Sequence, residues 1–235
     1  MLGLFFGMLG TTIGGIIGSF LKINSSKFLS LILEFTAGLM TAIICFDLIP
    51  ESLSLGNITL SIIGILAGIV CMFLCDNIIK NKKSSKLNNH FLETGFIIFL
   101  GLTIHNLPEG LAIGSGFDVS NTLGLSLAIA ICLHDIPEGI SIALPLQKGG
   151  SSKTKAIIMT AISGITTGIG ALLGAIIGNI SPSFISISLA FAAGAMLYIV
   201  SCELIPESKN IYHGRFSSMG NLLGIIFGIC AHIIV

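Results

Sequence analysis

The sequence predicts an all-α polytopic membrane protein of eight transmembrane helices in a 3+2+3 arrangement. Its 235 residues are 53% hydrophobic and 9% charged, whereas soluble domains carry about 25% charged residues. Apolar stretches of about 20 residues, the length needed to cross a bilayer, recur along the whole chain. A segment near the N-terminus is also repeated near the C-terminus. We therefore expect one transmembrane domain over residues 1–235 and no soluble domain of any size.

Each expected span is an apolar segment bounded by short polar connections, and the short connections predict a compact bundle. The first segment has neither a basic region before it nor a convincing cleavage site, which favours a span over a signal peptide. The eight predicted spans are residues 1–21, 28–50, 58–79, 92–115, 121–146, 155–179, 183–206 and 217–235.

The basic residues predict how the helices are oriented. Every one falls at or in the loops after the first, third, fifth and seventh spans; they are Lys22, Lys27, Lys80, Lys82, Lys83, Lys86, Lys148, Lys153, Lys155, Lys209 and Arg215. Basic residues near span ends stay in the cytoplasm. We expect a multi-pass protein of the plasma membrane with these four loops inside and both termini outside.

An internal repeat relates the first three predicted spans to the last three. Residues 35–52 align without gaps to residues 191–208, at an offset of 156, and both segments end in Pro-Glu-Ser. Under the predicted orientation, the two segments cross the membrane in opposite directions. Spans one to three and six to eight are therefore predicted to be inverted repeats around spans four and five, a recurring design among transporters.

The fourth and fifth spans each contain one copy of a hexapeptide, His-Asn-Leu-Pro-Glu-Gly over 105–110 and His-Asp-Ile-Pro-Glu-Gly over 134–139. Ionisable groups inside a membrane are costly and mark functional sites. Residues three and four apart share a helix face, so ligands from both spans converge if these spans pack face to face. One predicted set is His105, Glu109, His134 and Glu138, and the other is Asn106, Glu109, Asp135 and Glu138.

This combination of ligand types predicts a metal site within a cation pathway. Imidazole nitrogen and carboxylate oxygen together suit Zn²⁺, with Fe²⁺, Mn²⁺ and Co²⁺ also open. The shared glutamates could bridge two ions. Pro108 and Pro137 cannot donate hydrogen bonds to the carbonyls of Ile104 and Leu133, and we expect these freed carbonyls to point into the same pathway.

With its two Pro-Glu-Gly motifs and eight spans, the chain resembles the bacterial type of the ZIP (Zrt/Irt-like) family of divalent metal transporters. The resemblance covers essentially the whole sequence. It implies a 3+2+3 arrangement with a binuclear site between spans four and five, and Met40 as a thioether ligand of the first set. It also implies that Asp47 lies near the entrance to the site. Glu203 is, by the repeat, the hypothetical counterpart of Asp47 in span seven.

Two positions depart from the family pattern. Many members carry Glu in span six where this chain has Thr167, so the second metal position is expected to be weaker or absent. Asp135 stands where Asn is common and could restore part of the lost charge. Glu207 and His213, between spans seven and eight, are open to interpretation as an exit site or as solvated loop residues.

The resulting expectation is a secondary transporter, not an enzyme, that moves Zn²⁺ into the cytoplasm, with Fe²⁺, Mn²⁺, Co²⁺ and Cd²⁺ also open as substrates. One or two ions would bind as substrate, and no cofactor is expected. The lipid bilayer is the expected environment; zero net charge argues against nucleic acid, and no phosphate-binding loop indicates a nucleotide. An intramembrane zinc hydrolase is the alternative, disfavoured because no His-Glu-x-x-His helix is present. Carrier or channel mechanism, proton coupling and a homodimer stay open.

Overall fold

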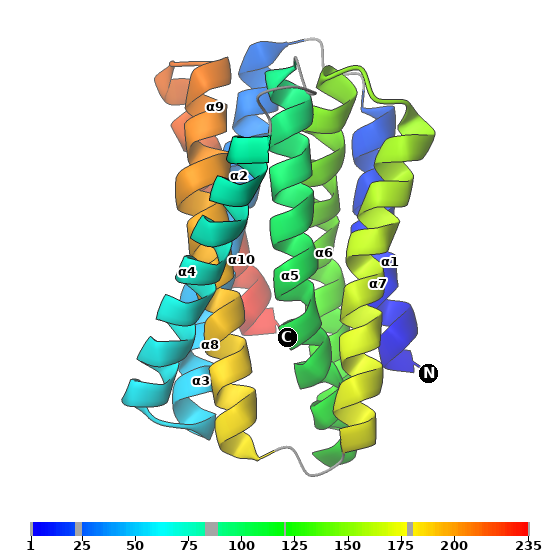
Figure 1. Ribbon diagram of the computed structural model, residues 1–235, viewed down its shortest axis with the longest axis vertical. Helices are drawn as coiled ribbons and strands as arrows, with labels where there is room; N and C mark the ends of the chain where they lie inside the picture. The colour runs from blue at the N-terminus through cyan, green and yellow to red at the C-terminus, as the bar shows by residue number, and fades with distance from the viewer. Residues whose placement is uncertain (1, 22–24, 83–88, 120, 178–180, 235) are drawn as a thin grey trace.

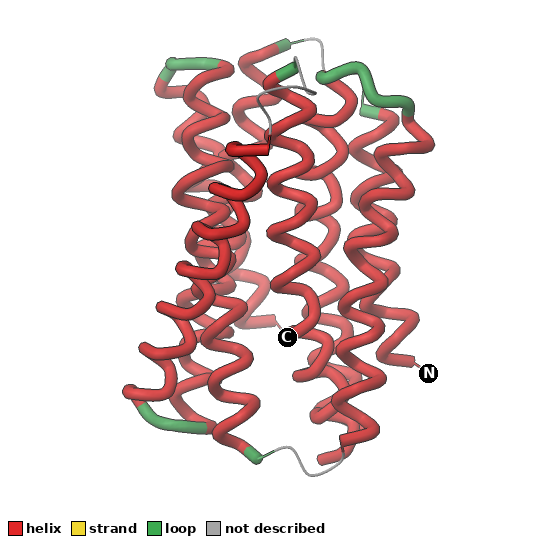
Figure 2. The backbone as a smooth tube through the Cα atoms, in the orientation of Figure 1, coloured by secondary structure: helices red, strands yellow, loops and turns green. Residues whose placement is uncertain are grey.

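The computed structural model describes residues 2–21, 25–82, 89–119, 121–177 and 181–234, which form a bundle of long helices with no strand (Figures 1 and 2). The α-helices are α1 (Leu2–Phe20), α2 (Ser26–Ile43), α3 (Ile49–Leu55), α4 (Ile58–Lys82), α5 (His90–Val119), α6 (Asn121–Lys148), α7 (Lys153–Ile177), α8 (Pro182–Tyr198), α9 (Ile205–Ile211) and α10 (Arg215–Ile234). Two short π-helices, Ile44–Leu48 and Ile199–Leu204, join α2 to α3 and α8 to α9.

The prediction of an all-helical membrane protein is confirmed. Among the described residues, seven helices are long and apolar enough to cross a bilayer, and α1 contributes a shorter apolar stretch, Met8–Phe20. The predicted span ends at residues 1, 178–179 and 235 lie outside the described residues, as do the basic residues Lys22, Lys83 and Lys86.

Two helices extend about one turn or more past the ends of their predicted spans. The helix expected over 28–50 extends to Leu55, and the helix expected over 183–206 extends to Ile211. A proline ring collides with the carbonyl four residues earlier and removes one hydrogen bond. In both helices a π-helical turn comes just before the proline, where Ile49 donates its N–H to the carbonyl of Ile44 and Ile205 donates to that of Val200. A wider turn of this kind lets the helix continue past the proline.

The helices form two groups that lie side by side in Figure 1. In the first group α1 packs against α6 and α7, and α5 packs against the same two helices; we call these four helices the site bundle. In the second group α2 packs against α10 and α9, and α8 packs against α4 and α3; we call these helices, with their π-turns, the flanking bundle. Contacts of α5 with α8 and of α2 with α6 join the two bundles.

The flanking bundle repeats its own construction at the 156-residue offset. Ser25 caps α2 by accepting a hydrogen bond from Phe28 N–H, and Ser181 caps α8 through Phe184 N–H. The two π-turns and the two short helices after them recur at the same offset. The Ser26–Leu55 helix descends in Figure 1, whereas the Pro182–Ile211 helix ascends. The repeat seen in the sequence is therefore also a repeat of local structure.

Hydrogen bonds between buried serines join these two long helices at both ends, and we call each pair of serines a serine clamp. Ser30 Oγ lies 2.8 Å from Ser208 Oγ and donates to the Ser208 carbonyl at 2.9 Å. At the opposite end, Ser186 Oγ donates to the Ser52 carbonyl at 2.7 Å and lies 3.3 Å from Ser52 Oγ. Because Ser186 and Ser208 are the repeat positions of Ser30 and Ser52, the two clamps are the same interaction made twice.

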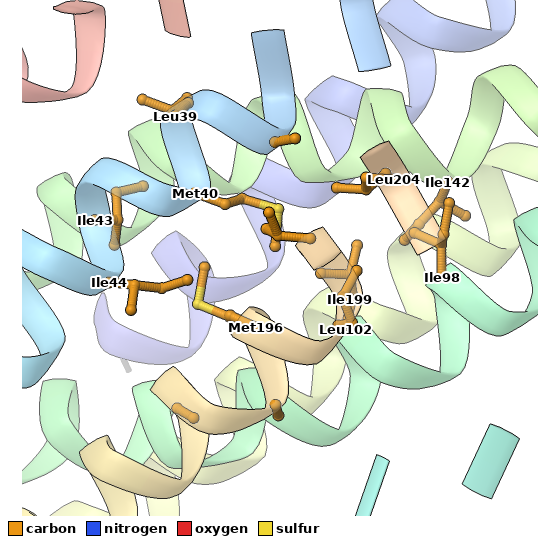
Figure 3. Packing of buried hydrophobic residues seen from close by; sticks show 14 of the residues in the cluster. Leu39, Met40, Ile43, Ile44, Ile98, Leu102, Ile142, Met196, Ile199 and Leu204 are labelled. Carbon is orange, nitrogen blue, oxygen red and sulfur yellow. The ribbon is translucent and has the colours of Figure 1, made fainter. Parts of the chain in front are cut away.

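Apolar side chains fill the region where the two bundles meet (Figure 3). Met40 and Met196, which occupy equivalent positions in the repeat, are buried there with Ile44, Ile199 and Leu102. On the outside, α4 and α10 expose large apolar residues at equivalent positions, among them Leu66 and Leu222. Apolar faces of this kind suit a lipid environment, in which burial against lipid tails replaces burial in a protein core.

The serine clamps give a prediction for stability. Ser30→Ala and Ser186→Ala each delete a buried hydroxyl that donates to a carbonyl of the facing helix, so each should cost about 0.5–1.5 kcal/mol of stability. Thermal unfolding of the detergent-solubilised protein should show a lower midpoint for both variants. Ser54→Ala, which removes an exposed hydroxyl bonded only to the Glu51 carbonyl, is the control and should unfold near the wild-type temperature. Unchanged midpoints for both clamp variants would contradict a stabilising role.

Candidate metal site

The two hexapeptides lie on α5 and α6, which pack directly against each other. Both helices continue through the motif prolines, Pro108 and Pro137. The glycine after each glutamate lies against the backbone of another helix. A Cβ on Gly110 would lie 2.0 Å from the Thr167 carbonyl of α7, and one on Gly139 would lie 2.1 Å from the Thr11 carbonyl of α1. The glycines therefore let α7 and α1 close over the two motifs.

The imidazoles and glutamates contact each other across the two helices. His105 Nε2 of α5 lies 3.2 Å from Glu138 Oε2 of α6, and His134 Nε2 of α6 lies 3.2 Å from Glu109 Oε1 of α5. Within α5, His105 Nδ1 is 3.6 Å from Glu109 Oε1. The structure thus brings together the four side chains of the first predicted ligand set, and the shortest of these contacts are between helices rather than along one helix.

The second predicted set shares the same buried space. Asp135 Oδ1 lies 3.5 Å from His134 Nε2. Glu109, His134 and Asp135 each offer a ligand atom within 4.8 Å of the others, an arrangement that could hold a metal ion. Asn106 is fully buried, and its amide nitrogen donates to the Ser163 carbonyl of α7 at 3.1 Å.

Many polar atoms of this cluster make no hydrogen bond within the described part of the chain. These atoms are His105 Nδ1, Asn106 Oδ1, both carboxylate oxygens of Glu109, His134 Nε2, both carboxylate oxygens of Asp135, and Glu138 Oε1. Apart from His134, at 11% side-chain exposure, the ionisable residues of the cluster are almost completely shielded from solvent. Buried carboxylates need positive charge or donors nearby. A divalent cation would supply both the charge and the missing coordination.

The α7 position singled out in the sequence lies beside the cluster. Thr167 is fully buried, and its hydroxyl has no hydrogen-bond partner among the described residues. Helix α7 thus presents a hydroxyl instead of a carboxylate at this position. The expectation that the second metal position is weaker stays a prediction.

The other candidate residues lie in the flanking bundle. Met40 is buried in the apolar cluster between the bundles (Figure 3), and its role as a thioether ligand stays a prediction. Asp47, in the first π-turn, is partly exposed, and its Oδ1 lies 2.6 Å from His232 Nδ1 of α10. Glu203 is buried in the second π-turn. Asp47 therefore pairs with a histidine of the flanking bundle, and the accessory role of Glu203 stays a prediction.

Several contacts between polar residues were not predicted from the sequence. His232 pairs with Asp47, and Tyr198 donates a hydrogen bond to Asp76 at 2.9 Å. Both His232 and Asp76 are ionisable residues within predicted spans, and this feature of the sequence could have marked them as residues with polar partners. Glu207 contacts His90 Nε2 at 2.7 Å, whereas His213 is exposed. Glu207 is therefore buried beside a histidine more than a hundred positions away and is not a solvated loop residue, and an exit site that includes it stays a prediction.

This fold and this site define a class of protein: multi-pass helical membrane proteins with a buried carboxylate–imidazole cluster. The sequence profile described as ZIP Zinc transporter matches residues 79–235. The chain is 30% identical over 245 residues to the zinc transporter ZupT of Chlorobium chlorochromatii, covering 94% of this chain and 91% of ZupT. The chain belongs to the ZIP zinc transporter family.

Two further relatives match a shorter stretch. The chain is 38% identical over 138 residues to the zinc transporter GufA of Myxococcus xanthus, covering 58% of this chain and 54% of GufA. It is 39% identical over 137 residues to the human zinc transporter ZIP11, covering 55% of this chain and 40% of ZIP11. The chain therefore spans about half of GufA and two fifths of ZIP11 in these matches.

The geometry of the cluster predicts the effect of removing one charge. Glu109 lies between His105 and His134, so Glu109→Gln keeps the size of the side chain but removes the carboxylate that both imidazoles approach. Residues that merely orient ligands cost 10–100-fold in metal affinity when lost, so this variant should lose at least about that much. Equilibrium dialysis with Zn²⁺ measures the loss. Glu51→Gln, at an exposed carboxylate of α3, is the control, and equal affinities for the two variants would contradict the site.

Proposed function

We propose that this protein is a secondary transporter that carries Zn²⁺ across the plasma membrane into the cytoplasm. The observation that carries the proposal is the buried cluster of His105, Glu109, His134, Asp135 and Glu138, in which several nitrogen and oxygen atoms make no hydrogen bond among the described residues. ZupT, GufA and ZIP11 are named zinc transporters, which supports the same cargo. Fe²⁺, Mn²⁺, Co²⁺ and Cd²⁺ are further candidate substrates because the same ligand types accept them.

The proposed topology has eight spans in a 3+2+3 arrangement, with α1 as the first span. Spans one to three and six to eight are inverted repeats, and the basic loops are cytoplasmic. The recurring serine caps, π-turns and serine clamps support the repeat. The ends of α2, α5, α7 and α10 that carry or adjoin the basic loops all lie at the upper end of the molecule in Figure 1, which supports a common side for these loops.

The ligand set suggests how an ion passes. An arriving cation exchanges its hydration shell for the oxygen and nitrogen atoms of α5 and α6, and its charge offsets the buried carboxylates. One or two ions act as substrate, with Asn106, Asp135 and the shared glutamates forming the second position and Met40 adding a thioether to the first. Asp47, with His232 beside it, would attract cations on the outer side, and Glu203 would act on the inner side.

Transport also requires the site to open to each side in turn. We propose that the site bundle moves relative to the flanking bundle, because apolar side chains such as Met40, Met196 and Leu102 fill the region where they meet. Contacts of this kind are non-directional, so they can be exchanged for similar contacts after a displacement. The ion gradient or the membrane potential would supply the energy.

A flux measurement tests the proposed function. Purified protein in sealed proteoliposomes should take up Zn²⁺, and Glu138→Ala should reduce uptake to the level of empty vesicles because it removes a glutamate shared by both ligand sets. Glu51→Ala, at an exposed carboxylate, is the matched control and should retain uptake. Parallel assays with Cd²⁺, Mn²⁺ and Fe²⁺ rank the substrates. Absence of flux for every metal, together with peptide or lipid cleavage that Glu138→Ala abolishes, would instead establish the hydrolase alternative.

The proposed orientation is tested by labelling. In a background with the six native cysteines replaced, Asn57→Cys between α3 and α4 should react with a membrane-impermeant maleimide on intact cells, because that connection is expected outside. Ser151→Cys between α6 and α7 should react only after the membrane is permeabilised. The reverse pattern would overturn the proposed orientation.

A further inference from the structure

The orientation of the Asn106 amide is set by a helix that carries none of the predicted ligands. Asn106 Nδ2 lies 3.1 Å from the Ser163 carbonyl oxygen and 3.3 Å from Ser163 Oγ, both on α7. A carbonyl oxygen can only accept a hydrogen bond, so the nitrogen side of the amide must face it. Asn106 Oδ1 is therefore turned away from Ser163 and is left buried without a hydrogen-bond partner among the described residues.

The Ser163 carbonyl is itself held in place. Thr166 Oγ1 lies 2.6 Å from the Ser163 carbonyl and 3.0 Å from the Thr103 carbonyl of α5, so its hydroxyl links the two helices. The backbones approach closely just beyond this point, where a Cβ on Gly170 would lie 2.2 Å from the Leu107 carbonyl. The acceptor that meets Asn106 thus belongs to a tightly packed helix pair rather than to a mobile segment.

The equivalent position in the second motif has different surroundings. Asp135 packs against α1, where a Cβ on Gly10 would lie 2.6 Å from Asp135 Cβ, and neither of its carboxylate oxygens has a hydrogen-bond partner in the described residues. A carboxylate at position 106 would instead place an oxygen against the Ser163 carbonyl oxygen, and two acceptors repel each other. The neighbouring helices therefore account for an amide in one motif and a carboxylate in the other.

We propose that Ser163 is a positioning residue for the metal site: its carbonyl and hydroxyl hold the Asn106 amide so that Oδ1 is a fixed, neutral oxygen ligand. This inference rests on the proposed function, since the cation that Oδ1 meets is the transported metal. It assigns to α7 a role in ion binding although Thr167 supplies no carboxylate. It also limits the negative charge of the site to that of Glu109, Asp135 and Glu138.

A double-mutant cycle on Zn²⁺ affinity, measured by equilibrium dialysis in detergent, tests this role. Ser163→Ala removes one of the two acceptors and should weaken binding about two- to tenfold, the range expected for one hydrogen bond. In the Asn106→Ala background the same change should have no further effect, because Ser163 acts through the amide. A loss of equal size in both backgrounds, or no loss in either, would overturn the proposal.

A second variant and a control separate positioning from a general effect on the fold. Asn106→Asp adds a charged ligand, yet it should bind Zn²⁺ no more tightly than wild type because its carboxylate faces the Ser163 carbonyl; tighter binding would overturn the proposal. Ser186→Ala deletes a buried hydroxyl in the flanking bundle and should leave the affinity unchanged even if it lowers stability. A loss of affinity there equal to that of Ser163→Ala would also count against positioning.

The proposed function can fail independently of this result. Normal Zn²⁺ binding with the expected coupling but no flux in proteoliposomes would refute transport and leave the role of Ser163 intact. Flux that depends on Glu138, together with additive effects of Ser163 and Asn106, would refute the positioning role alone. Absence of Zn²⁺ binding by the wild-type protein would overturn both.

Discussion

The arrangement of this protein follows from the need to keep three carboxylates and two imidazoles inside a membrane. Glu109, Asp135 and Glu138 are nearly or completely buried, and transferring a charged group out of water costs several kcal/mol even after the protein relaxes. The cross-helix contacts of the imidazoles with Glu109 and Glu138 offset part of this cost. The oxygens of Asp135 and Asn106 Oδ1 still lack a hydrogen bond among the described residues, and a divalent cation would meet the needs of both.

Such a cluster can exist only where lipid is excluded, and the glycines of the site bundle make this possible. Gly110 and Gly139 leave room for the backbones of α7 and α1, which cover the two motifs. The same close approach allows the Ser163 carbonyl to meet Asn106 directly. Any larger residue at either glycine would push the covering helix outward and admit lipid or water to the carboxylates. The motif glycine is thus as much a part of the site as the glutamate before it.

The sequence predicted the helical class from composition and the internal repeat from an ungapped alignment. It predicted the convergence of the two motifs from helical spacing together with the assumption that the fourth and fifth spans pack face to face. It did not predict that the helices pass Pro50 and Pro206, since a π-turn that tolerates proline has no distinct residue signature. The contacts of Asn106 with Ser163, of Asp47 with His232 and of Glu207 with His90 also escaped prediction. These pairs depend on how separate helices are rotated against each other, which the periodicity of a single helix does not determine.

The distribution of polar contacts supports relative movement of the two bundles. The serine clamps, the Tyr198–Asp76 hydrogen bond and the ion pair of Lys209 with Glu34 at 2.8 Å lie within the flanking bundle. The contacts of Asn106 and Thr166 lie within the site bundle. A displacement of one bundle along the other leaves all of these intact and exchanges mainly apolar contacts. His90 and Glu207, however, join α5 to α9 across the boundary. Because directional bonds must break before the bundles can separate at that end, this pair would add a cost to the proposed movement that the apolar contacts do not.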